Sequence, residues 1–284
     1  MKTVAILMSV HGGRAETLTT LESCLRQFDA FKTLQEYRFS VYITLDNCTE
    51  SMADAISQAY PEVRLVDSPV RLFWTNGISL AWKEAALSEC DFYLWIKKGA
   101  KLMDHSLAVL LEISYHLRDK AIVTGTVASP DGQILKGGRT RSGKLIQPDP
   151  VIPLPCEIFD GDIVLVPHYV YSVLGKMDRK FVHSFGDYDY AVRAQKEEIT
   201  VAIAPGILAL REDDHMFPVW RDGNKSLRER YATVSGPEGK PFRERFMYDM
   251  RRRGVAYAVF NFISENLKIL FPQNGSTLFS RLFR

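Results

Sequence analysis

Along the first hundred residues of this 284-residue chain, short apolar runs alternate with stretches in which apolar residues recur at the spacing of a helix. Leucines recur at three- and four-residue intervals within residues 17–28, which is the spacing of one helix face. This alternation predicts parallel strands joined by right-handed crossovers, and therefore an α/β fold with a mostly parallel central sheet. The expected strands are residues 4–10, 39–45, 63–66, 92–96, 121–128, 163–167 and 200–204, and the expected helices are 17–28, 52–60, 76–87, 106–117 and 188–195.

The composition fits one globular domain with an appended tail better than two equal domains. Hydrophobic residues make up 46% of the chain and charged residues 25%, which is ordinary for a protein with a large core. The net charge is only +2, so the protein does not have the strongly basic surface of nucleic-acid binders, and no nucleic-acid partner is expected. Residues 221–284 hold thirteen Lys/Arg and six Asp/Glu, a net charge of +7, which leaves about −5 for residues 1–220. We expect a domain at 1–220 and a basic helical extension at 221–284.

Cysteine usage and hydropathy indicate a cytoplasmic protein. The apolar run near the N-terminus ends too soon, at Ser9, for a signal peptide. No segment offers the roughly 20 uncharged apolar residues of a membrane span. A cytoplasmic location is expected, with peripheral association at the inner face of the membrane as a further possibility. Disulfides and a metal cluster are not expected because four cysteines lie without metal-ligand spacing, at Cys24, Cys48, Cys90 and Cys156.

The aromatic and aliphatic run at 92–96 predicts a central strand buried on both faces. In an open α/β sheet the carboxyl ends of central strands are where ligands bind. This strand ends in Lys97-Lys98-Gly99, which places two cations at the expected ligand position. Asp104 follows as the expected cap of the helix at 106–117.

Residues 183–194 read His-Ser-Phe-Gly-Asp-Tyr-Asp-Tyr-Ala-Val-Arg-Ala. This segment resembles Gly-Asp-Tyr-Asp-Tyr-Gly-Leu-Arg-Ala in the rhamnosyltransferase-like branch of the family-two glycosyltransferases, which have the Rossmann-like GT-A fold. The resemblance implies that Asp187 is the base of an inverting transfer, removing the proton from the acceptor hydroxyl. It also implies that Asp189 orients the helix carrying Arg193, with His183 on the acceptor side. The alternative is that Asp187 and Asp189 only cap a helix.

Two strand ends nearer the N-terminus resemble the same family. Asp46 matches the family's strand-end Asp, which contacts the nucleotide base or ribose, and a carboxylate can accept two donors there. The alternative for Asp46 is a cap of the following helix. His11 and Arg14 flank two glycines where the family has His/Tyr-Asn-Arg, which indicates an anion site. The alternative for them is a glycine turn with a solvated arginine.

The helix expected at 76–87 follows Phe-Trp-Thr, and the segment resembles Phe-Trp-Gly-Gly-Gly of the rhamnosyltransferase-like branch. Its N-terminus is expected to face the donor phosphates, with Asn76 and Gly77 as binding residues and Trp74 in the core. Asp160 lies in a segment that resembles the family's donor-sugar element, where acids replace the usual amides. Residues 136–139 and 236–241 also resemble this branch, so the likeness runs from about residue 4 to 271 with one break at 97–99.

That break removes the acidic run with which family members hold Mg or Mn on the donor diphosphate. A lysine is a compact monocation, so Lys97 or Lys98 could offset the charge that develops as the diphosphate departs. No cofactor is predicted on this interpretation, and turnover would be independent of metal. The alternatives are a decayed site in a binding or scaffold protein, or lysines that are merely solvated.

The sequence therefore predicts a glycosyltransferase that moves a hexose-type sugar from a nucleotide donor, UDP- or dTDP-linked, to a glycan or lipid-linked glycan acceptor. The expected context is bacterial cell-surface polysaccharide synthesis, for example of lipopolysaccharide. One alternative is a catalytically degenerate GT-A scaffold in polysaccharide assembly. Another is a nucleotidyltransferase, for which the loop at 11–14 is a poor match.

The extension has an amphipathic pattern over residues 241–270. We expect it to lie on an anionic membrane surface or to dock a partner. The alternative is that its apolar stripe packs on the catalytic domain. The apolar residues near helical spacing are Phe242, Phe246, Met250, Val259, Phe260, Ile263, Leu267 and Leu270, beside Arg243, Arg245, Arg251, Arg252 and Arg253.

Overall fold

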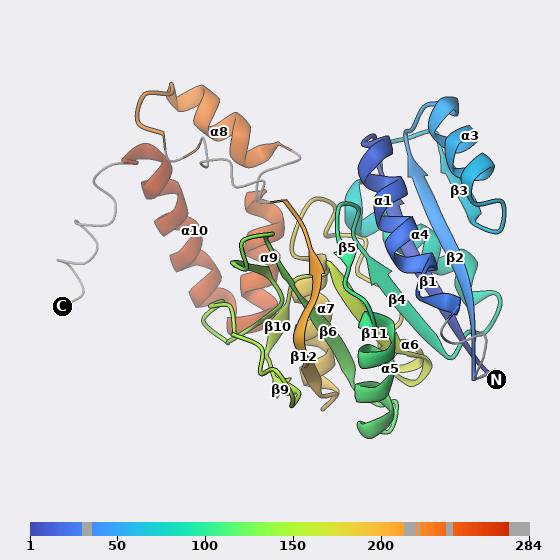
Figure 1. Ribbon diagram of the computed structural model, residues 1–284. Coiled ribbons are helices and arrows are strands. Elements are labelled where there is room, and N and C mark those ends of the chain that lie inside the picture. The colour runs from blue at the N-terminus through green and yellow to red at the C-terminus, as the bar shows by residue number, and fades with distance from the viewer. Residues whose placement is uncertain (30–35, 213–219, 221, 237–240, 273–284) are drawn as a thin grey trace.

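The structure, a computed structural model, describes residues 1–29, 36–212, 220, 222–236 and 241–272 (Figure 1). A twisted sheet runs through the main body in the strand order β3-β2-β1-β4-β11-β6-β12-β5. The strands of this path are β1 (Lys2–Val10), β2 (Tyr37–Asp46), β3 (Arg64–Ser68), β4 (Phe92–Ile96), β5 (Lys101–Leu102), β6 (Ile122–Ala128), β11 (Ile163–Pro167) and β12 (Val201–Leu210). Short strands β7 (Ile134–Lys136) and β9 (Leu154–Pro155) pair with it, while β8 (Gly138–Arg139) and β10 (Ile158–Phe159) pair with each other.

The first four strands are parallel, as the strand–helix alternation predicted. β1 pairs in parallel with both β2 and β4, and β2 pairs in parallel with β3. β11 is antiparallel to both β4 and β6, with Ile163 opposite Ile96. The beginning of β11 therefore lies at the edge where β4 ends, and the loop before β11 joins the carboxyl ends of β1, β2 and β4.

Helices cover both faces of the sheet, and the strands alternate their side chains between two cores. Ile6 and Met8 of β1 enter one core with α1, α3 and α5, while Leu7 enters the other with α4, α6 and α7. This alternation is the period-two pattern of a strand buried on both faces. The helices of the main body are α1 (Arg14–Leu25), α3 (Glu50–Ala59), α4 (Phe73–Ala86), α5 (Ser106–His116), α6 (His168–Leu174) and α7 (Gly186–Lys196).

The second core is built from large aromatic rings. Trp95 of β4 lies 5.3 Å, between ring centroids, from both Trp82 of α4 and Tyr190 of α7. Trp74, at the start of α4, meets the edge of Trp95 at 6.3 Å. Because aromatic rings bury large areas and prefer such edge and tilted contacts, this cluster fixes α4 and α7 against β4.

Several boundaries differ from the sequence-based expectation; for example, α1 begins at Arg14 rather than at 17, and β12 extends to Leu210 rather than ending at 204. Helix α4 begins at Phe73 rather than at residue 76, and α7 begins at Gly186 rather than at 188. The N-cap of α5 is His105, whereas Asp104 instead forms an ion pair with Arg26 at 3.1 Å. The loop expected at 137–155 contains the short strands β8 and β9.

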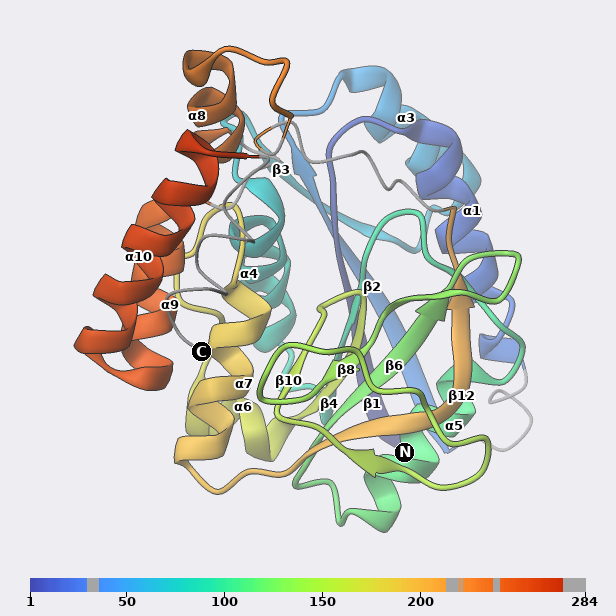
Figure 2. The ribbon, with the colours of Figure 1, turned by 90° about the vertical axis from the view of Figure 1, so that its left-hand side faces the viewer.

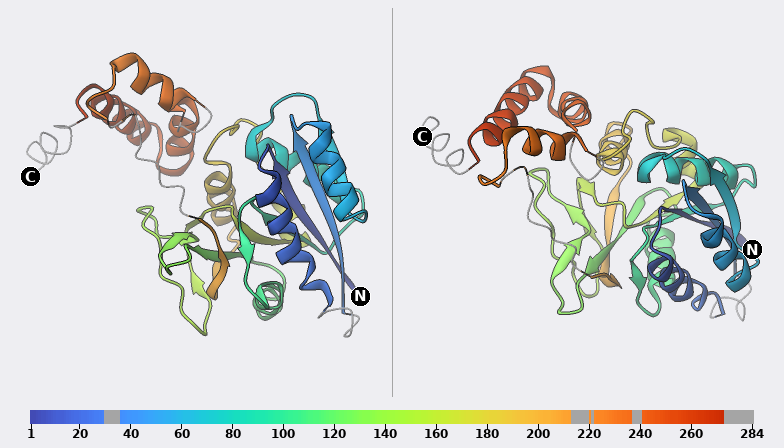
Figure 3. Two further views of the ribbon diagram at one scale, coloured as in Figure 1. Left: turned by 45° about the horizontal axis from the view of Figure 1, so that its top comes forward. Right: turned by 90° about the horizontal axis from the view of Figure 1, so that it is seen from above.

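Of the C-terminal helices, α9 packs beside α7, and α10 packs on α9 and α8 (Figures 2 and 3). They are α8 (Leu227–Ser235), α9 (Phe242–Arg253) and α10 (Val255–Leu270). Gly254 joins α9 to α10 with φ of 89°, a conformation that glycine adopts at no steric cost. Helix α9 packs on the domain, with Tyr248 stacked on Phe185 at 5.1 Å between ring centroids. The membrane or partner role expected for the apolar residues of the extension stays a prediction. Within the described residues, no helix has both the length and the apolarity to cross a membrane.

Candidate functional site

The loops that follow β1, β2 and β4 meet the loop before β11 and the start of α7 at one edge of the sheet. They bring together His11, Asp46, Lys97, Asp160 and Asp187. The first and the last of these residues are 176 positions apart in the sequence. An edge of this kind is the usual ligand position of an open α/β sheet. The predicted residues thus gather at one edge, although their contacts differ in kind.

Asp187 is held by backbone groups. Its Oδ2 accepts a hydrogen bond from the Gly161 N–H at 2.8 Å, and its Oδ1 accepts one from the Tyr188 N–H at 2.9 Å. Burial, with the nearby charge of Asp160, raises the pKa of the Asp187 carboxyl to about 6, while the two N–H donors and Lys97 oppose the rise. A carboxyl that titrates near neutral pH suits a general base.

Gly161 allows the chain to approach Asp187 closely. A Cβ built on this residue would lie 2.2 Å from the Trp74 ring and 3.2 Å from the Asp187 Cβ. Any side chain here would displace one of them, so the glycine is required by space rather than by its backbone angle. The acidic segment 160–162 is consequently held directly against α4 and α7.

The two lysines after β4 point to different places. The Lys97 Nζ lies 5.4 Å from the centroid of the Trp74 ring, and the charge of Lys97 lowers the pKa of Asp187. The Lys98 Nζ instead pairs with Glu16 at 2.9 Å, directly over Gly13 at the start of α1. Only Lys97 therefore lies beside the candidate base.

Two further acids at this edge are paired with arginines. Asp160 binds Arg139 at 2.9 Å and accepts a hydrogen bond from the Tyr188 hydroxyl at 3.0 Å. Asp162 binds Arg211 at 2.8 Å. Among the described residues, no group of three or more His, Cys, Asp or Glu side chains could hold a metal ion. Two ammonium groups stand in place of the acidic run, and Asp160 and Asp162 are already bound to arginines, so neither is free to act as a metal ligand. Metal-independent turnover stays a prediction.

Asp46 uses its carboxylate to hold the beginning of α4. It is buried, and it accepts hydrogen bonds from the N–H groups of Leu72 and Phe73, the latter at 3.0 Å. His11 Nδ1 donates to the Asp46 carbonyl oxygen at 2.6 Å. A capping role was the alternative for Asp46, but the helix that it caps is α4 rather than the following helix. Direct contact between Asp46 and a nucleotide stays a prediction.

Asn76 and Gly77 lie within the first turns of α4, one turn further along than expected. A Cβ on Gly77 would meet the Ser9 side chain at 2.0 Å, so Gly77 lets α4 pack tightly on β1. The Oδ1 of Asn76 is buried with no hydrogen-bond partner in the described structure, and the same holds for the Nε1 of Trp74. Arg14 is exposed as the first residue of α1. Ligand contacts of Asn76, Gly77 and Arg14 stay predictions.

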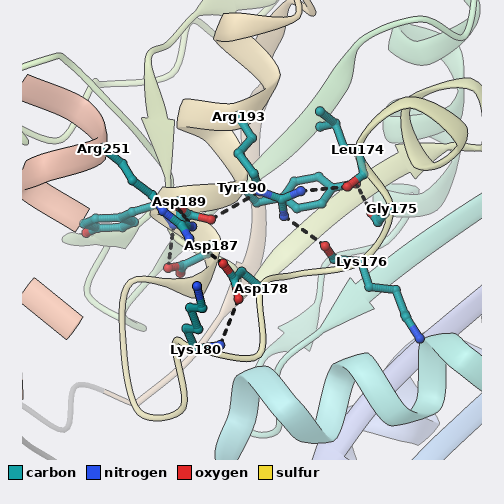
Figure 4. Close-up of polar contacts among 11 residues, drawn as sticks. Leu174, Gly175, Lys176, Asp178, Lys180, Asp187, Asp189, Tyr190, Arg193 and Arg251 are labelled. Atoms are coloured by element: carbon teal, nitrogen blue, oxygen red, sulfur yellow. Dashed lines mark hydrogen bonds and ion pairs between the residues drawn. The ribbon is translucent and has the colours of Figure 1, made fainter. Parts of the chain in front are cut away.

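Asp189 belongs to an ion-pair network rather than to the cluster around Asp187 (Figure 4). It is fully buried, 3.2 Å from Arg193 of the same helix and 2.8 Å from Arg251 of α9. Arg251 also binds Asp178 at 2.6 Å, and Arg193 donates to the carbonyl oxygens of Leu174 and Lys176. The network fixes the orientation of α7 from both sides, which suits the helix-orienting role expected for Asp189 and Arg193.

A second link from α9 holds the loop before α7. Glu244 accepts hydrogen bonds from His183 Nδ1 at 2.9 Å and from the Ser184 N–H at 2.9 Å. The His183 ring also lies 4.4 Å, between centroids, from the ring of Phe73. His183 is therefore a structural contact between α4, α7 and α9, and its contact with an acceptor stays a prediction.

Several residues at this edge were not expected from the sequence, namely Arg139, Arg211, Glu244 and Arg251. Each forms a hydrogen bond with a residue that lies between 21 and 73 positions away in the sequence. The sequence signals were the run of arginines at 251–253 and the likeness of residues 136–139 to the rhamnosyltransferase-like branch, and neither reveals which acid is bound. Charge pairs between distant segments become visible only when the helices are in place.

Comparison with solved structures shows the fold. A structure of GalNAc-T7 with UDP, GalNAc and Mn2+ superimposes with a TM-score of 0.53 at 12% sequence identity, over 95% of this chain. The match covers 58% of the GalNAc-T7 chain, so this chain spans less than two thirds of its neighbour's length. No family model and no curated protein sequence matches the chain. The protein therefore has the GT-A fold, as the sequence predicted, whereas the family-two rhamnosyltransferase branch stays a prediction.

Replacing Asp46 tests how its carboxylate is used. Asp46→Ala should lower the free energy of unfolding by about 1–3 kcal/mol, because two part-buried N–H groups at the start of α4 lose their acceptor. Asp67→Ala, at an exposed position of the neighbouring β3, is the matched control and should leave stability unchanged. Chemical denaturation measures both. Wild-type stability together with weakened nucleotide binding would instead make Asp46 a direct ligand.

Proposed function

We propose that this protein is an inverting glycosyltransferase that moves a sugar from a nucleoside-diphosphate donor to a glycan acceptor. The observation that carries the proposal is the half-buried Asp187 carboxyl at the edge of a GT-A sheet, held by two backbone N–H groups and with its pKa raised to about 6. A solved structure with the same fold, GalNAc-T7, contains UDP. The resemblance of residues 183–194 to the family-two segment independently assigns the base role to the same residue.

In the proposed reaction, one Asp187 oxygen removes the proton from an acceptor hydroxyl. The acceptor oxygen forms a bond to the anomeric carbon while the bond from that carbon to the diphosphate oxygen breaks, and the diphosphate leaves with the electron pair. The Gly161 and Tyr188 N–H groups keep the carboxylate in one orientation, which lowers the entropic barrier to proton transfer. Each oxygen retains a lone pair for the substrate.

The departing diphosphate gains negative charge, which the site must offset. Lys97 is the best-placed group for this role, since its ammonium lies over Trp74 and acts on Asp187 without an ion-pair partner among the described acids. Lys98 is already paired with Glu16. The proposed enzyme therefore uses Lys97 in place of the metal that the family-two resemblance implies.

The wider role proposed is synthesis of a bacterial cell-surface polysaccharide such as lipopolysaccharide, with a UDP- or dTDP-sugar as donor and a glycan or lipid-linked glycan as acceptor. The alternative is a catalytically degenerate GT-A protein that binds the same ligands as a scaffold. The Lys97-Lys98-Gly99 replacement supports that alternative, and the retained Asp187 environment opposes it. A thermal-shift screen of UDP-, GDP- and dTDP-sugars would identify the donor, and binding without turnover would favour the scaffold.

Asp187→Asn should reduce transfer by about 10²–10⁴-fold while donor binding stays within about twofold, because only proton removal is lost. The rate is measured as nucleoside-diphosphate release from the donor found in the screen. Asp67→Asn, which removes an exposed carboxylate, is the control and should keep the wild-type rate. A rate above about a tenth of wild type for Asp187→Asn would exclude Asp187 as the base.

The pH profile should follow the titration of Asp187. The base acts only when deprotonated, so kcat/KM should be level above an apparent pKa of about 6 and fall about tenfold per pH unit below it. Lys97→Met should shift this acid limb to higher pH, because the lysine charge lowers the pKa of Asp187. An acid limb that stays in place in Lys97→Met would contradict the placement of that ammonium beside the base.

Metal removal tests the lysine-for-metal role. Treatment with EDTA should change the turnover rate by less than about twofold. Lys97→Met should lower the turnover rate by at least about tenfold at a pH where Asp187 is fully deprotonated, since a charge-stabilising group is worth that much or more. Lys98→Met is the matched comparison and should have the smaller effect because Lys98 is bound to Glu16. Strong dependence on manganese would overturn this part of the proposal.

A further inference from the structure

Helix α10 exposes large apolar side chains and buries mostly small or polar ones, which is the opposite of an ordinary surface helix. Its buried face is mostly small or polar, with Ala258, Asn261 and Ser264 directed inward, and Asn261 donates to the buried Asp249 of α9 at 2.5 Å. Large apolar side chains face outward, where an ordinary surface helix carries polar residues. The residues exposed by more than 40% include Val255, Val259, Phe262, Ile263 and Leu270, with Phe271 directly after the helix.

This outward face forms a stripe along the helix. Val255, Val259, Ile263 and Leu270 recur at intervals of four and seven residues, which keeps them on one side. The apolar residues of α9 do not extend the stripe, because Phe242 and Phe246 pack against Phe262 within the helix pair. The face therefore belongs to α10, the helix on the left-hand side of Figure 1.

The stripe carries no unpaired charge among the described residues. From Gly254 to Pro272 the charged residues are Glu265 and Lys268, which bind each other at 2.8 Å. With 16 residues the helix is about 24 Å long, shorter than the roughly 20-residue segment that spans a bilayer. An apolar face on a helix of this length can lie in a membrane interface but cannot cross it.

Cations border the N-terminal end of the stripe. Arg252 and Arg253, which precede α10, both donate to the carbonyl oxygen of Arg141. Arg141, Lys196 and Arg252 line a cavity of about 210 Å³ between α7 and α9. Among the described residues that line it, Glu157 is the one acid, and it lies 4.0 Å from Arg141. The basic rim, defined as Arg141, Lys196, Arg252 and Arg253, adjoins the apolar stripe through Arg253, two residues before Val255.

We propose that the α10 stripe and the basic rim dock this protein on the surface of an anionic lipid bilayer. The stripe enters the boundary between headgroups and acyl chains, and the basic rim contacts the anionic headgroups. The resulting membrane association is peripheral. An anionic bilayer binds a protein surface that combines an apolar face with neighbouring cations, because it offers both acyl chains and anionic headgroups.

Charge argues against a second copy of the chain as the occupant. An isologous contact would place the basic rim of one copy beside α10 of the other. The only acid on that helix, Glu265, is already paired with Lys268. Residues 221–284 carry a net charge of +7, so two such segments repel each other and are both attracted by anionic lipid.

Docking at α10 would also orient the catalytic edge. Arg251 and Glu244 join α9 to Asp189 and His183 at the start of α7, which carries Asp187. The membrane-bound face is thereby rigidly linked to the candidate base. If the proposed transfer is correct, the acceptor would be a lipid-linked glycan presented at this surface, and only this last step rests on the proposed function.

Co-sedimentation of the full chain with vesicles tests the docking without any substrate. The wild type should bind vesicles of phosphatidylglycerol and phosphatidylcholine at low salt, and much less at high salt or with phosphatidylcholine alone. Val259→Glu combined with Ile263→Glu should lower the bound-to-free ratio at least about tenfold. Leu87→Glu combined with Tyr115→Glu adds the same charge at exposed apolar positions elsewhere, after the last residue of α4 and within α5, and should bind like the wild type.

The basic rim is tested separately with Arg141→Gln combined with Lys196→Gln, which should weaken binding and reduce its dependence on salt. Circular dichroism and sedimentation equilibrium are recorded for every variant. Absence of vesicle binding by the wild type, or equal binding by the Val259→Glu and Ile263→Glu variant, would overturn the proposal. A wild-type dimer that this variant converts to a monomer would overturn it in favour of a second copy. None of these outcomes depends on transferase activity.

Discussion

The contact of Trp95 with rings from two helices is the constraint on which the candidate site depends. Trp95 lies on β4, and it touches Trp82 and Trp74 of α4 and Tyr190 of α7. These contacts place the N-terminal ends of both helices at the edge where the parallel strands end. Without them the Asp187 carboxyl would not meet the Gly161 N–H across the gap between α7 and β11.

The charges at this edge divide into two kinds. Asp160, Asp162 and Asp189 are each bound to an arginine, so they hold segments together. Asp187 is bound by backbone N–H groups instead, and burial raises its pKa. Asp187 therefore has no arginine partner among the described residues, unlike Asp160, Asp162 and Asp189. Asp46 is likewise bound by backbone N–H groups, but both of its contacts hold the beginning of α4.

The C-terminal helices have two unlike sides. On the inner side, Glu244 and Arg251 of α9 satisfy buried groups at the beginning of α7, so this helix completes the site rather than hanging from it. On the outer side, α10 exposes its apolar residues and buries Asn261 against Asp249. Residues 241–270 therefore do not present one continuous amphipathic face. Phe242 and Phe246 of α9 pack against Phe262 of α10, whereas Val255, Val259 and Ile263 of α10 are exposed.

Sequence alone determined the α/β class, the parallel first strands and the position of β4, because local periodicity and apolar runs reflect burial directly. It also singled out the segment 183–194, whose Asp187 lies at the sheet edge. Only the tertiary structure decided that Asp46 holds α4, that Lys98 binds Glu16 while Lys97 faces Asp187, and that Asp189 binds Arg251. Each of these depends on which distant group fills the same buried space, and pairing between segments far apart in the chain leaves no periodic trace in the sequence.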